Sequence, residues 1–496
     1  MTNLFVKSAP AQRIQTKHTV VHVSLLLFLG TSLIYLAFLK PGIWGFDGSD
    51  MLNMAKSLVL EGDFSIPKGA GAVLGRDGQY YSIRYPLLPV ISTPFVAVGL
   101  WLGHALNLPT HYTAAVCALI VSILLTAWST VAVYLLALRL GSSAVGAYSA
   151  ALCFAFGTVA LVYGHQFFAE PLLAALTVTA VLLAFQASPS AWGVGGLTML
   201  SIMAKPAGIV IGPVLAGYFL LKRYSLKRVA LPLLGTAMGV LLYMAYNYLR
   251  FGSIFSAGQS TSRFTLEGFI PRLVGLLLSP GAGGGLFWYC PVTLLAGVGL
   301  WKLAKGDRLA EALAVLGMFS SYWILYSFWQ FGGWSWGPRF LVPTLPLLLA
   351  PTALLDARGR RWLLALAAVG FLVNVPTLLT FYQRYYAEAS DAGKLVQALA
   401  LWGNGLDAPL FNIWGAALRQ LDVALSVDVR SVLNSAGTPP AAGNLLSADL
   451  MQVMAVWWWF LPAVGMPLWL GIVAALGLIA GGVSCLWGWA QQSRRL

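Results

Sequence analysis

Long apolar runs separated by short polar segments make up most of this chain. Such runs favour membrane-crossing α-helices, because about 20 apolar residues in helical conformation span the hydrocarbon core of a bilayer. We expect crossings at residues 19–39, 86–105, 112–138, 144–163, 171–188, 190–204, 207–221, 229–248, 286–301, 309–330, 340–355, 361–380 and within 451–489. The pattern predicts an all-α polytopic membrane protein with about 11 to 14 transmembrane helices.

The composition excludes a soluble domain and argues against a nucleic-acid partner. Hydrophobic residues make up 59% of the chain and charged residues only 9%, whereas about a quarter of a soluble protein is charged. The net charge is +14, but the basic residues stand in short clusters between apolar runs. These clusters lie at residues 7–17, 222–228, 302–308, 358–361 and 494–495. By the positive-inside rule they mark cytoplasmic loops.

This topology divides the chain into four parts. Residues 1–18 form a cytoplasmic tail, 19–380 a transmembrane module, 381–450 an external segment, and 451–496 a last transmembrane segment with its cytoplasmic tail. The external segment contains an amphipathic stretch, residues 410–429, which we expect to lie on the outer membrane surface. One inconsistency remains upstream. Counting crossings from the N-terminus puts residues 165–170 inside, whereas counting back from the later basic clusters puts them outside.

Five of the sixteen acidic residues lie in one predicted external loop, residues 40–85. Acidic residues beside a bilayer cost free energy unless they are solvated or functional. Asp47 and Asp50 are spaced to point to one side of a helix start. Each could accept a proton from a hydroxyl as a general base, or could simply cap the helix. The other three, Glu61, Asp63 and Asp77, are expected to stay solvated.

The loop resembles the start of a known enzyme family. Its pattern is Trp44, Asp47, Met51, Met54, Ala55, Leu58, Gly62 and Asp63, followed by Arg84-Tyr85-Pro86. This pattern is similar to that of the GT-C membrane glycosyltransferases, particularly the branch of protein O-mannosyltransferases and the aminoarabinose transferase acting on lipid A. Met51 stands where that family usually has tyrosine.

Further segments carry the same resemblance, in the same order along the chain. They are residues 165–172, 203–206, 246–253, 285–291 and 332–340. The resemblance spans residues 19–345, and residues 381–496 do not share in it. The external segment 381–450 is therefore a candidate for choosing the acceptor, since loops on a rigid scaffold carry specificity.

The resemblance implies a GT-C fold and an inverting sugar transfer outside the bacterial plasma (inner) membrane. The donor would be a polyprenyl-phosphate sugar, and the acceptor a hydroxyl of a protein, lipid or polysaccharide. Asp47 matches the catalytic aspartate of the family and Glu170 its second acidic position. Arg84 matches a charged residue near the lipid phosphate.

Two other basic residues suit a phosphate leaving group, which needs nearby positive charge. Lys205 interrupts an apolar stretch just before a proline, where a cavity is tolerated; its alternative role is that of a snorkelling lysine at a helix end. Arg339 could bind phosphate through two N–H groups, or could be an interfacial anchor with the aromatic-belt residues Trp334 and Trp336. Those tryptophans could equally stack on a sugar.

The remaining candidates have an ordinary role beside a functional one. Glu170 could be a first-turn acid favoured by the helix dipole, or could orient a hydroxyl together with His165. Asp47 and Glu170 could hold a divalent ion, although the sequence decides neither for nor against a metal. Asn247 and Arg250 could contact substrate or could cap a helix end.

Two other classes of function compete with the enzyme. A transporter or flippase of a lipid-linked sugar or anion would have charged residues along a path open to both faces. An assembly subunit without activity would leave Asp47 and Glu170 far apart.

Overall fold

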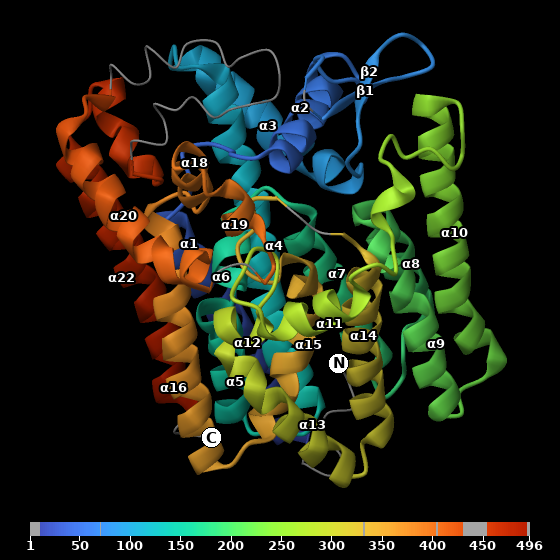
Figure 1. Cartoon of the computed structure of the whole chain (residues 1–496). Helices are drawn as coiled ribbons and strands as arrows, with labels where there is room; N and C mark the ends of the chain where they lie inside the picture. Colours follow the sequence, from blue (N-terminus) through green and yellow to red (C-terminus); the bar gives the residue numbers. More distant parts are fainter. Residues whose placement is uncertain (1–9, 70, 331–332, 403–404, 430–453, 494–496) are drawn as a thin grey trace.

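The computed structural model of this chain describes residues 10–69, 71–330, 333–402, 405–429 and 454–493. The described residues are overwhelmingly helical, and they contain one two-stranded antiparallel sheet, β1 (Ala72–Leu74) and β2 (Tyr80–Ser82) (Figure 1). In the sheet, Ala72 pairs with Ser82 and Leu74 with Tyr80. The predicted all-α class is confirmed.

The helices follow one another along the chain, with α for α-helices and η for 3-10 helices. In order they are α1 (Pro10–Ala37), α2 (Phe46–Leu60), α3 (Leu87–Ala105), α4 (Thr110–Arg139), α5 (Ala144–Gly157), α6 (Ala160–Tyr163), α7 (Ala169–Ala184), α8 (Ala191–Ala204), η1 (Pro206–Val210), α9 (Ile211–Leu221), α10 (Leu226–Phe251), η2 (Thr261–Arg263), α11 (Phe269–Leu278), α12 (Leu286–Tyr289), η3 (Pro291–Leu295), α13 (Ala296–Lys305), α14 (Leu309–Phe328), η4 (Arg339–Thr344), α15 (Leu345–Leu349), η5 (Ala350–Leu354), α16 (Ala357–Asn374), α17 (Pro376–Leu379), α18 (Gln383–Asp391), α19 (Leu395–Leu399), η6 (Gly405–Asp407), α20 (Pro409–Ser426), η8 (Trp457–Val464) and α22 (Leu468–Ser493).

The apolar runs of the sequence form the helical body of the molecule. Seven of the described helices are long and apolar enough to cross a membrane, and six further apolar helices are shorter. The predicted runs at residues 286–301 and 340–355 are built from short α and 3-10 pieces, several of which begin at a proline or contain one, among them Pro291 and Pro343. Proline lacks the N–H that a continuous α-helix needs, so these runs are broken although they are apolar.

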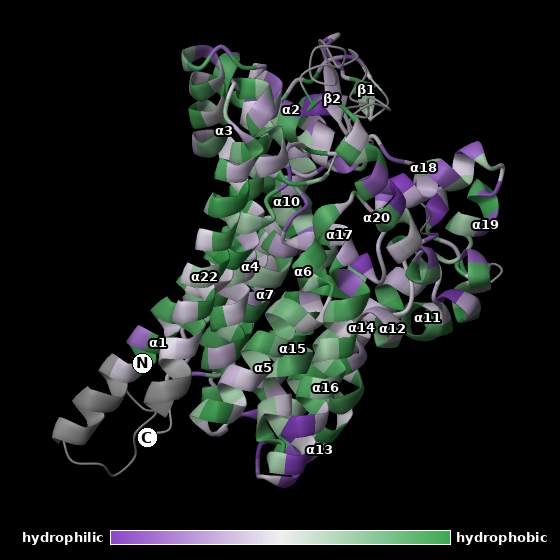
Figure 2. Ribbon diagram, turned by 90° about the vertical axis from the view of Figure 1, so that its left-hand side faces the viewer, coloured by the Kyte–Doolittle hydropathy of each residue, from purple (hydrophilic) through white to green (hydrophobic). Residues whose placement is uncertain are grey.

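The two ends of the helical body differ in charge. Figures 1 and 2 show α2 and the β1–β2 hairpin at one end and α13 at the other. Basic loops meet at the α13 end, where Lys222 pairs with Glu311 at 3.1 Å and Arg308 donates to the carbonyl of Arg139 at 2.6 Å. We call this the basic end and its opposite the loop end. The arrangement agrees with a cytoplasmic basic end.

The path of α3 resolves the inconsistency in the predicted topology. Tyr85, just before α3, lines the same cavity as Asp47 at the loop end. Leu106, just after α3, lines a second cavity together with Pro41 and Trp44, which also belong to the loop that follows α1. Both ends of α3 therefore lie on the loop side, so α3 does not run from one end of the helical body to the other, although it is one of the seven helices long and apolar enough to cross a membrane. Sequence hydropathy alone could not reveal this, because α3 is as apolar as a spanning helix.

The C-terminal third adds short helices at the loop end and a long helix beside α1. The predicted amphipathic stretch at residues 410–429 largely coincides with α20, and part of the external segment, residues 430–450, lies outside the described residues. Helix α22 packs closely on α1, where Gly30 and Gly482 let the backbones approach. Helix α11 lies between the predicted crossings at residues 229–248 and 286–301.

Candidate active site

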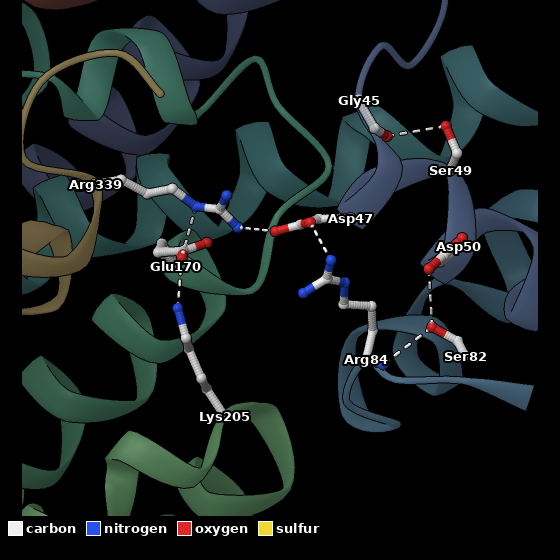
Figure 3. A network of polar contacts seen from close by, with 9 residues as sticks. All are labelled: Gly45, Asp47, Ser49, Asp50, Ser82, Arg84, Glu170, Lys205 and Arg339. Atoms are coloured by element: carbon white, nitrogen blue, oxygen red, sulfur yellow. Dashed lines mark hydrogen bonds and ion pairs between the residues drawn. The ribbon is translucent and has the colours of Figure 1, made fainter. Parts of the chain in front are cut away.

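Four chain segments bring charged side chains together at the loop end. Asp47 comes from the start of α2, Glu170 from the start of α7, Lys205 from the break between α8 and η1, and Arg339 from the start of η4. Arg84 joins them from the segment between β2 and α3. Figure 3 shows these five side chains directed toward one another, and we call them the charged cluster.

Asp47 bridges two arginines. Its Oδ1 lies 2.6 Å from Nη2 of Arg84, and its Oδ2 lies 2.6 Å from Nη2 of Arg339. Burial alone would raise the pKa of Asp47, but the guanidinium groups of Arg84 and Arg339 outweigh it and hold that pKa well below the usual range. Gly45 is the N-cap of α2, with a φ of 108°, and the side chain of Asp47 caps nothing. The helix-cap role considered for Asp47 is therefore wrong.

Glu170 is the buried anchor of the cluster. Its side chain is fully buried, and its Oε1 accepts hydrogen bonds from Lys205 Nζ at 2.7 Å and from Arg339 Nε at 2.8 Å. Arg339 thus joins both carboxylates through one guanidinium group. This contact contradicts the assembly-subunit reading, which required Asp47 and Glu170 to lie far apart. The cluster carries three positive and two negative charges, which leaves a net charge of +1.

Lys205 stays inside the protein instead of reaching for a membrane surface. It has extended backbone geometry between α8 and η1, and its side chain is 8% exposed. Its ammonium group lies 4.6 Å from the ring centroid of Phe340 and 5.5 Å from that of Tyr326. These aromatic faces and Glu170 replace part of its hydration. The snorkelling role does not fit this position.

A cavity of about 870 Å³ exposes the cationic side of the cluster. Asp47, Arg84, Lys205 and Arg339 line it, and Glu170 lies behind them. Aromatic side chains form much of the remaining wall: Phe168, Tyr243, Phe264, Tyr326, Trp329, Trp334 and Phe340. The cavity can therefore hold an anion together with apolar or ring-shaped groups. Its lining residues come from the loop end, and the basic clusters at residues 222–228, 302–308 and 358–361 contribute none.

Trp334 and Trp336 have different surroundings. Trp334 lines the cavity and stacks on Tyr386, with ring centroids 5.8 Å apart. Trp336 is fully buried and donates from Nε1 to Asn374 at 2.7 Å. Trp334 is thus accessible from the cavity, whereas Trp336 is held within the core.

His165 does not meet Glu170. Both of its ring nitrogens contact backbone carbonyl oxygens, those of Leu161 at 2.7 Å and Tyr35 at 2.9 Å, and its ring stacks on Tyr35. The predicted pairing of His165 with Glu170 is therefore replaced by contacts that join α1 to α6.

Asp50, Asn247 and Arg250 lie behind the cavity wall. Asp50 is 2% exposed and accepts a hydrogen bond from Ser82 Oγ at 3.3 Å. Burial is the main reason why the pKa of Asp50 is raised to about 6. Asn247 and Arg250 are buried at the C-terminal end of α10 and contact each other. Glu61, Asp63 and Asp77 are exposed, as expected.

Sequence reasoning missed two features of the site: the aromatic side chains beside Lys205, and the contact between the external segment and the loop that carries Asp47. Tyr326 and Phe340 stack with their centroids 4.5 Å apart, but aromatic residues are common in apolar runs and gave no signal. Gln383 lines the cavity and donates to the carbonyl of Trp44 at 3.4 Å. The start of the external segment thus contacts the loop that carries Asp47.

A divalent ion would find few ligands in the described residues. Both oxygens of Asp47 are engaged by arginines, and the described part of the chain contains no group of three or more His, Cys, Asp or Glu side chains placed to hold a metal. The set of side chains thus fits an anion better than a cation, and the chemistry below is derived from these residues alone.

The comparisons with known proteins concern the fold. No protein-family model and no curated protein matches the sequence. Among solved structures, the chain is similar to ArnT from Cupriavidus metallidurans bound to undecaprenyl phosphate, with 17% identity, a TM-score of 0.46, and coverage of 96% of this chain and 78% of ArnT. It is also similar to the oligosaccharyltransferase AglB from Archaeoglobus fulgidus in complex with an inhibitory peptide and a dolichol-phosphate, with 13% identity, a TM-score of 0.46, and coverage of 84% of this chain and 58% of AglB. The chain thus spans little more than half the length of AglB.

Proposed function

We propose that this chain is an inverting glycosyltransferase of the GT-C type in the bacterial plasma membrane. It transfers a sugar from a polyprenyl-phosphate donor to an acceptor hydroxyl at the external face. The observation that carries the proposal is that one carboxylate, Asp47, lies among three cations in the wall of one cavity. A hydroxyl nucleophile needs a base, and a phosphate leaving group needs positive charge.

The reaction follows from these two needs. The acceptor oxygen attacks the anomeric carbon of the sugar while its proton passes to the carboxylate of Asp47. The bond between that carbon and the phosphate oxygen breaks, and the phosphate leaves with the electron pair. Arg84, Arg339 and Lys205 stabilise the charge that develops on it. Attack opposite the leaving group inverts the configuration of the anomeric carbon.

Asp47 must change partners before it can act as a base. While Arg84 and Arg339 hold its carboxylate, the pKa of Asp47 is low and its affinity for a proton is poor. A phosphate entering the cavity offers both arginines a competing anion. Contacts of the arginines with phosphate would weaken their hold on Asp47 and raise its basicity, so that the base is activated only when the donor is bound.

Glu170 acts through other residues in this scheme. It is fully buried behind Lys205 and Arg339, so it orients the two cations instead of touching a substrate. A single buried carboxylate that accepts from both cations fixes their spacing. We therefore assign Glu170 as a positioning residue, in place of a residue that orients the acceptor hydroxyl.

The transporter remains the alternative function. A transported lipid-linked anion would need access from both faces, whereas the lining of the cavity is confined to the loop end. That asymmetry favours the enzyme.

The test is transfer by the purified full chain in lipid. A panel of labelled polyprenyl-phosphate sugars is offered with protein, lipid and polysaccharide acceptors, and an active pair identifies both substrates. The Asp47→Asn variant should lose at least about 100-fold in turnover, as expected for loss of a general base. The Asp63→Asn variant is the control, because Asp63 is exposed on the same loop and its carboxylate accepts hydrogen bonds from Ser57 and Ser65. Full turnover by a folded Asp47→Asn protein would contradict the proposal.

A further inference from the structure

The position of Arg84 depends on a turn that has little support of its own. Arg84 is the one cation of the charged cluster that comes from the external loop; Lys205 and Arg339 lie where membrane-embedded helices begin or end. Its backbone N–H donates to Ser82 Oγ at 3.0 Å, at the end of β2. Three-residue strands such as β1 and β2 form a marginal sheet in isolation. Something else must hold Ser82 in place.

Arg250 supplies that support from the end of α10. Its Nη1 donates to the carbonyl oxygen of Ser82, and its own carbonyl accepts from the backbone N–H of Arg76 at 3.0 Å. Arg250 thus forms hydrogen bonds with the hairpin at two places, after β1 and at the end of β2. Arg250 is 2% exposed. It has no ion-pair partner among the described residues, so its charged donors serve backbone and amide oxygens.

Arg250 is itself fixed by its own helix. Its Nη2 donates to Asn247 Oδ1 at 2.9 Å and its Nε to the carbonyl of Tyr246 at 3.3 Å. Its guanidinium group lies 3.7 Å from the ring centroid of Tyr246 and 4.6 Å from that of Phe251. The planar group is therefore held in one orientation, which lysine could not reproduce.

Asp50 completes the support from the opposite side. It accepts a hydrogen bond from Ser82 Oγ, the same oxygen that accepts from the Arg84 N–H. The backbone at Gly71 lies so close to the Asp50 carboxylate that a Cβ at that position would overlap it. The hairpin is thus clamped between α2, which carries Asp47, and α10, which carries Arg250.

We infer that Arg250 is a positioning residue that sets the place of Arg84 in the cavity through Ser82. The inference rests on the proposed function, because it takes Arg84 as a ligand of the donor phosphate. It gives Asn247, Arg250 and Asp50 a common role: they hold the loop that delivers Arg84, and they do not touch substrate. A helix-capping role alone would not link Arg250 to phosphate affinity.

The experiment measures binding of undecaprenyl phosphate to the full chain in lipid nanodiscs. The Arg250→Lys variant should weaken the Kd roughly tenfold, the size expected when one coupled contact is loosened. The control is Arg308→Lys, since Arg308 also donates to a backbone carbonyl but lies at the basic end. Ser82→Ala, a smaller change, should weaken binding in the same direction, and it covers the case in which Arg250→Lys does not fold.

A double-mutant cycle separates positioning from general damage. In an Arg84→Gln background, Arg250→Lys should have almost no further effect on the Kd, because the residue through which it acts has been removed. Equal weakening in both backgrounds, or wild-type affinity in both Arg250→Lys and Ser82→Ala, would overturn the inference and leave the proposed function intact. Failure of the wild-type protein to bind undecaprenyl phosphate would overturn both.

Discussion

Replacing Asp47 by asparagine should lower turnover at least about 100-fold and yet tighten the binding of undecaprenyl phosphate. The reason is the double role that we propose for the carboxylate: it is the base of the reaction, and it is also the anion that occupies Arg84 and Arg339 before a phosphate arrives. Asparagine keeps the shape of the side chain and removes its charge. Both arginines then become more available to phosphate.

The structure gives the size of this effect. The two contacts of Asp47 are charge-assisted hydrogen bonds of 2.6 Å, and each such bond contributes about 1.5–3 kcal/mol when buried. The side chain of Asp47 is 21% exposed, so water screens part of this energy, and asparagine retains a weaker bond through its oxygen. We expect a net gain of about 1.5 kcal/mol in binding, or roughly a tenfold lower Kd.

The assay is equilibrium binding of undecaprenyl phosphate to the full chain in nanodiscs, supported by the rise in melting temperature that bound ligand produces. Asp63→Asn controls for loss of one negative charge on the same loop. A Kd that is unchanged or higher in Asp47→Asn would refute the idea that Asp47 competes with phosphate. If a chelator also raised the Kd of the wild-type protein to the same value, a metal shared by Asp47 and the phosphate would be the better account.

Three further predictions concern stability and the cavity. The pKa of Asp50 is raised to about 6, against 3.8 in the unfolded chain, so the folded state holds this proton more tightly. The free energy of unfolding should therefore fall by up to about 3 kcal/mol as the pH rises from 4 to 7. In melting curves recorded across this pH range, the Asp50→Asn variant should lack that part of the fall. Glu170→Gln should lower the free energy of unfolding by about 3–5 kcal/mol, because it leaves buried cations without their anion. The control is Glu388→Gln, since Glu388 pairs with Arg384 and Arg419 at the surface, and it should change the free energy of unfolding by no more than about 1 kcal/mol. Equal effects of the two variants would contradict the buried network. Trp336→Ala should lower the free energy of unfolding by about 3–5 kcal/mol. Trp334→Ala should preserve the melting temperature and lower kcat/KM for transfer. A loss of stability in Trp334→Ala without one in Trp336→Ala would contradict these roles.

The sequence was informative where chemistry and hydropathy agree. The cost of charge beside a bilayer pointed to Asp47 and Lys205, the family resemblance to Arg84 and Glu170, and phosphate chemistry to Arg339. The structure brings all five into one cluster. That the cluster contains ion pairs could not be predicted, because its members lie up to 292 residues apart. Their apposition depends on how the helices pack.

Other features lacked any local signal. Both ends of α3 lie on the loop side, and the position of these ends depends on tertiary contacts that the apolar run itself does not encode. The support of Ser82 by Arg250 joins residues 168 positions apart, and helix capping was the natural reading of Arg250 from its place near the end of a predicted helix. His165 was linked to Glu170 by proximity in sequence, but the turn after α6 directs its ring toward α1.

The charge of the cluster follows the course of the proposed reaction. Three cations and two carboxylates give a net charge of +1 at rest, which matches the single negative charge of a phosphodiester donor. After transfer, Asp47 has taken the acceptor proton and the cluster carries +2. The leaving polyprenyl phosphate is then a monoester with a charge of about −1.5 to −2 at pH 7. Proton transfer to Asp47 therefore adds positive charge to the cavity at the moment when the leaving group gains negative charge. Loss of that proton returns the cluster to +1, weakens its hold on the phosphate and favours product release. The Asp47→Asn variant has a fixed charge of +2, so its affinity should rise more for polyprenyl phosphate than for the glycosylated donor.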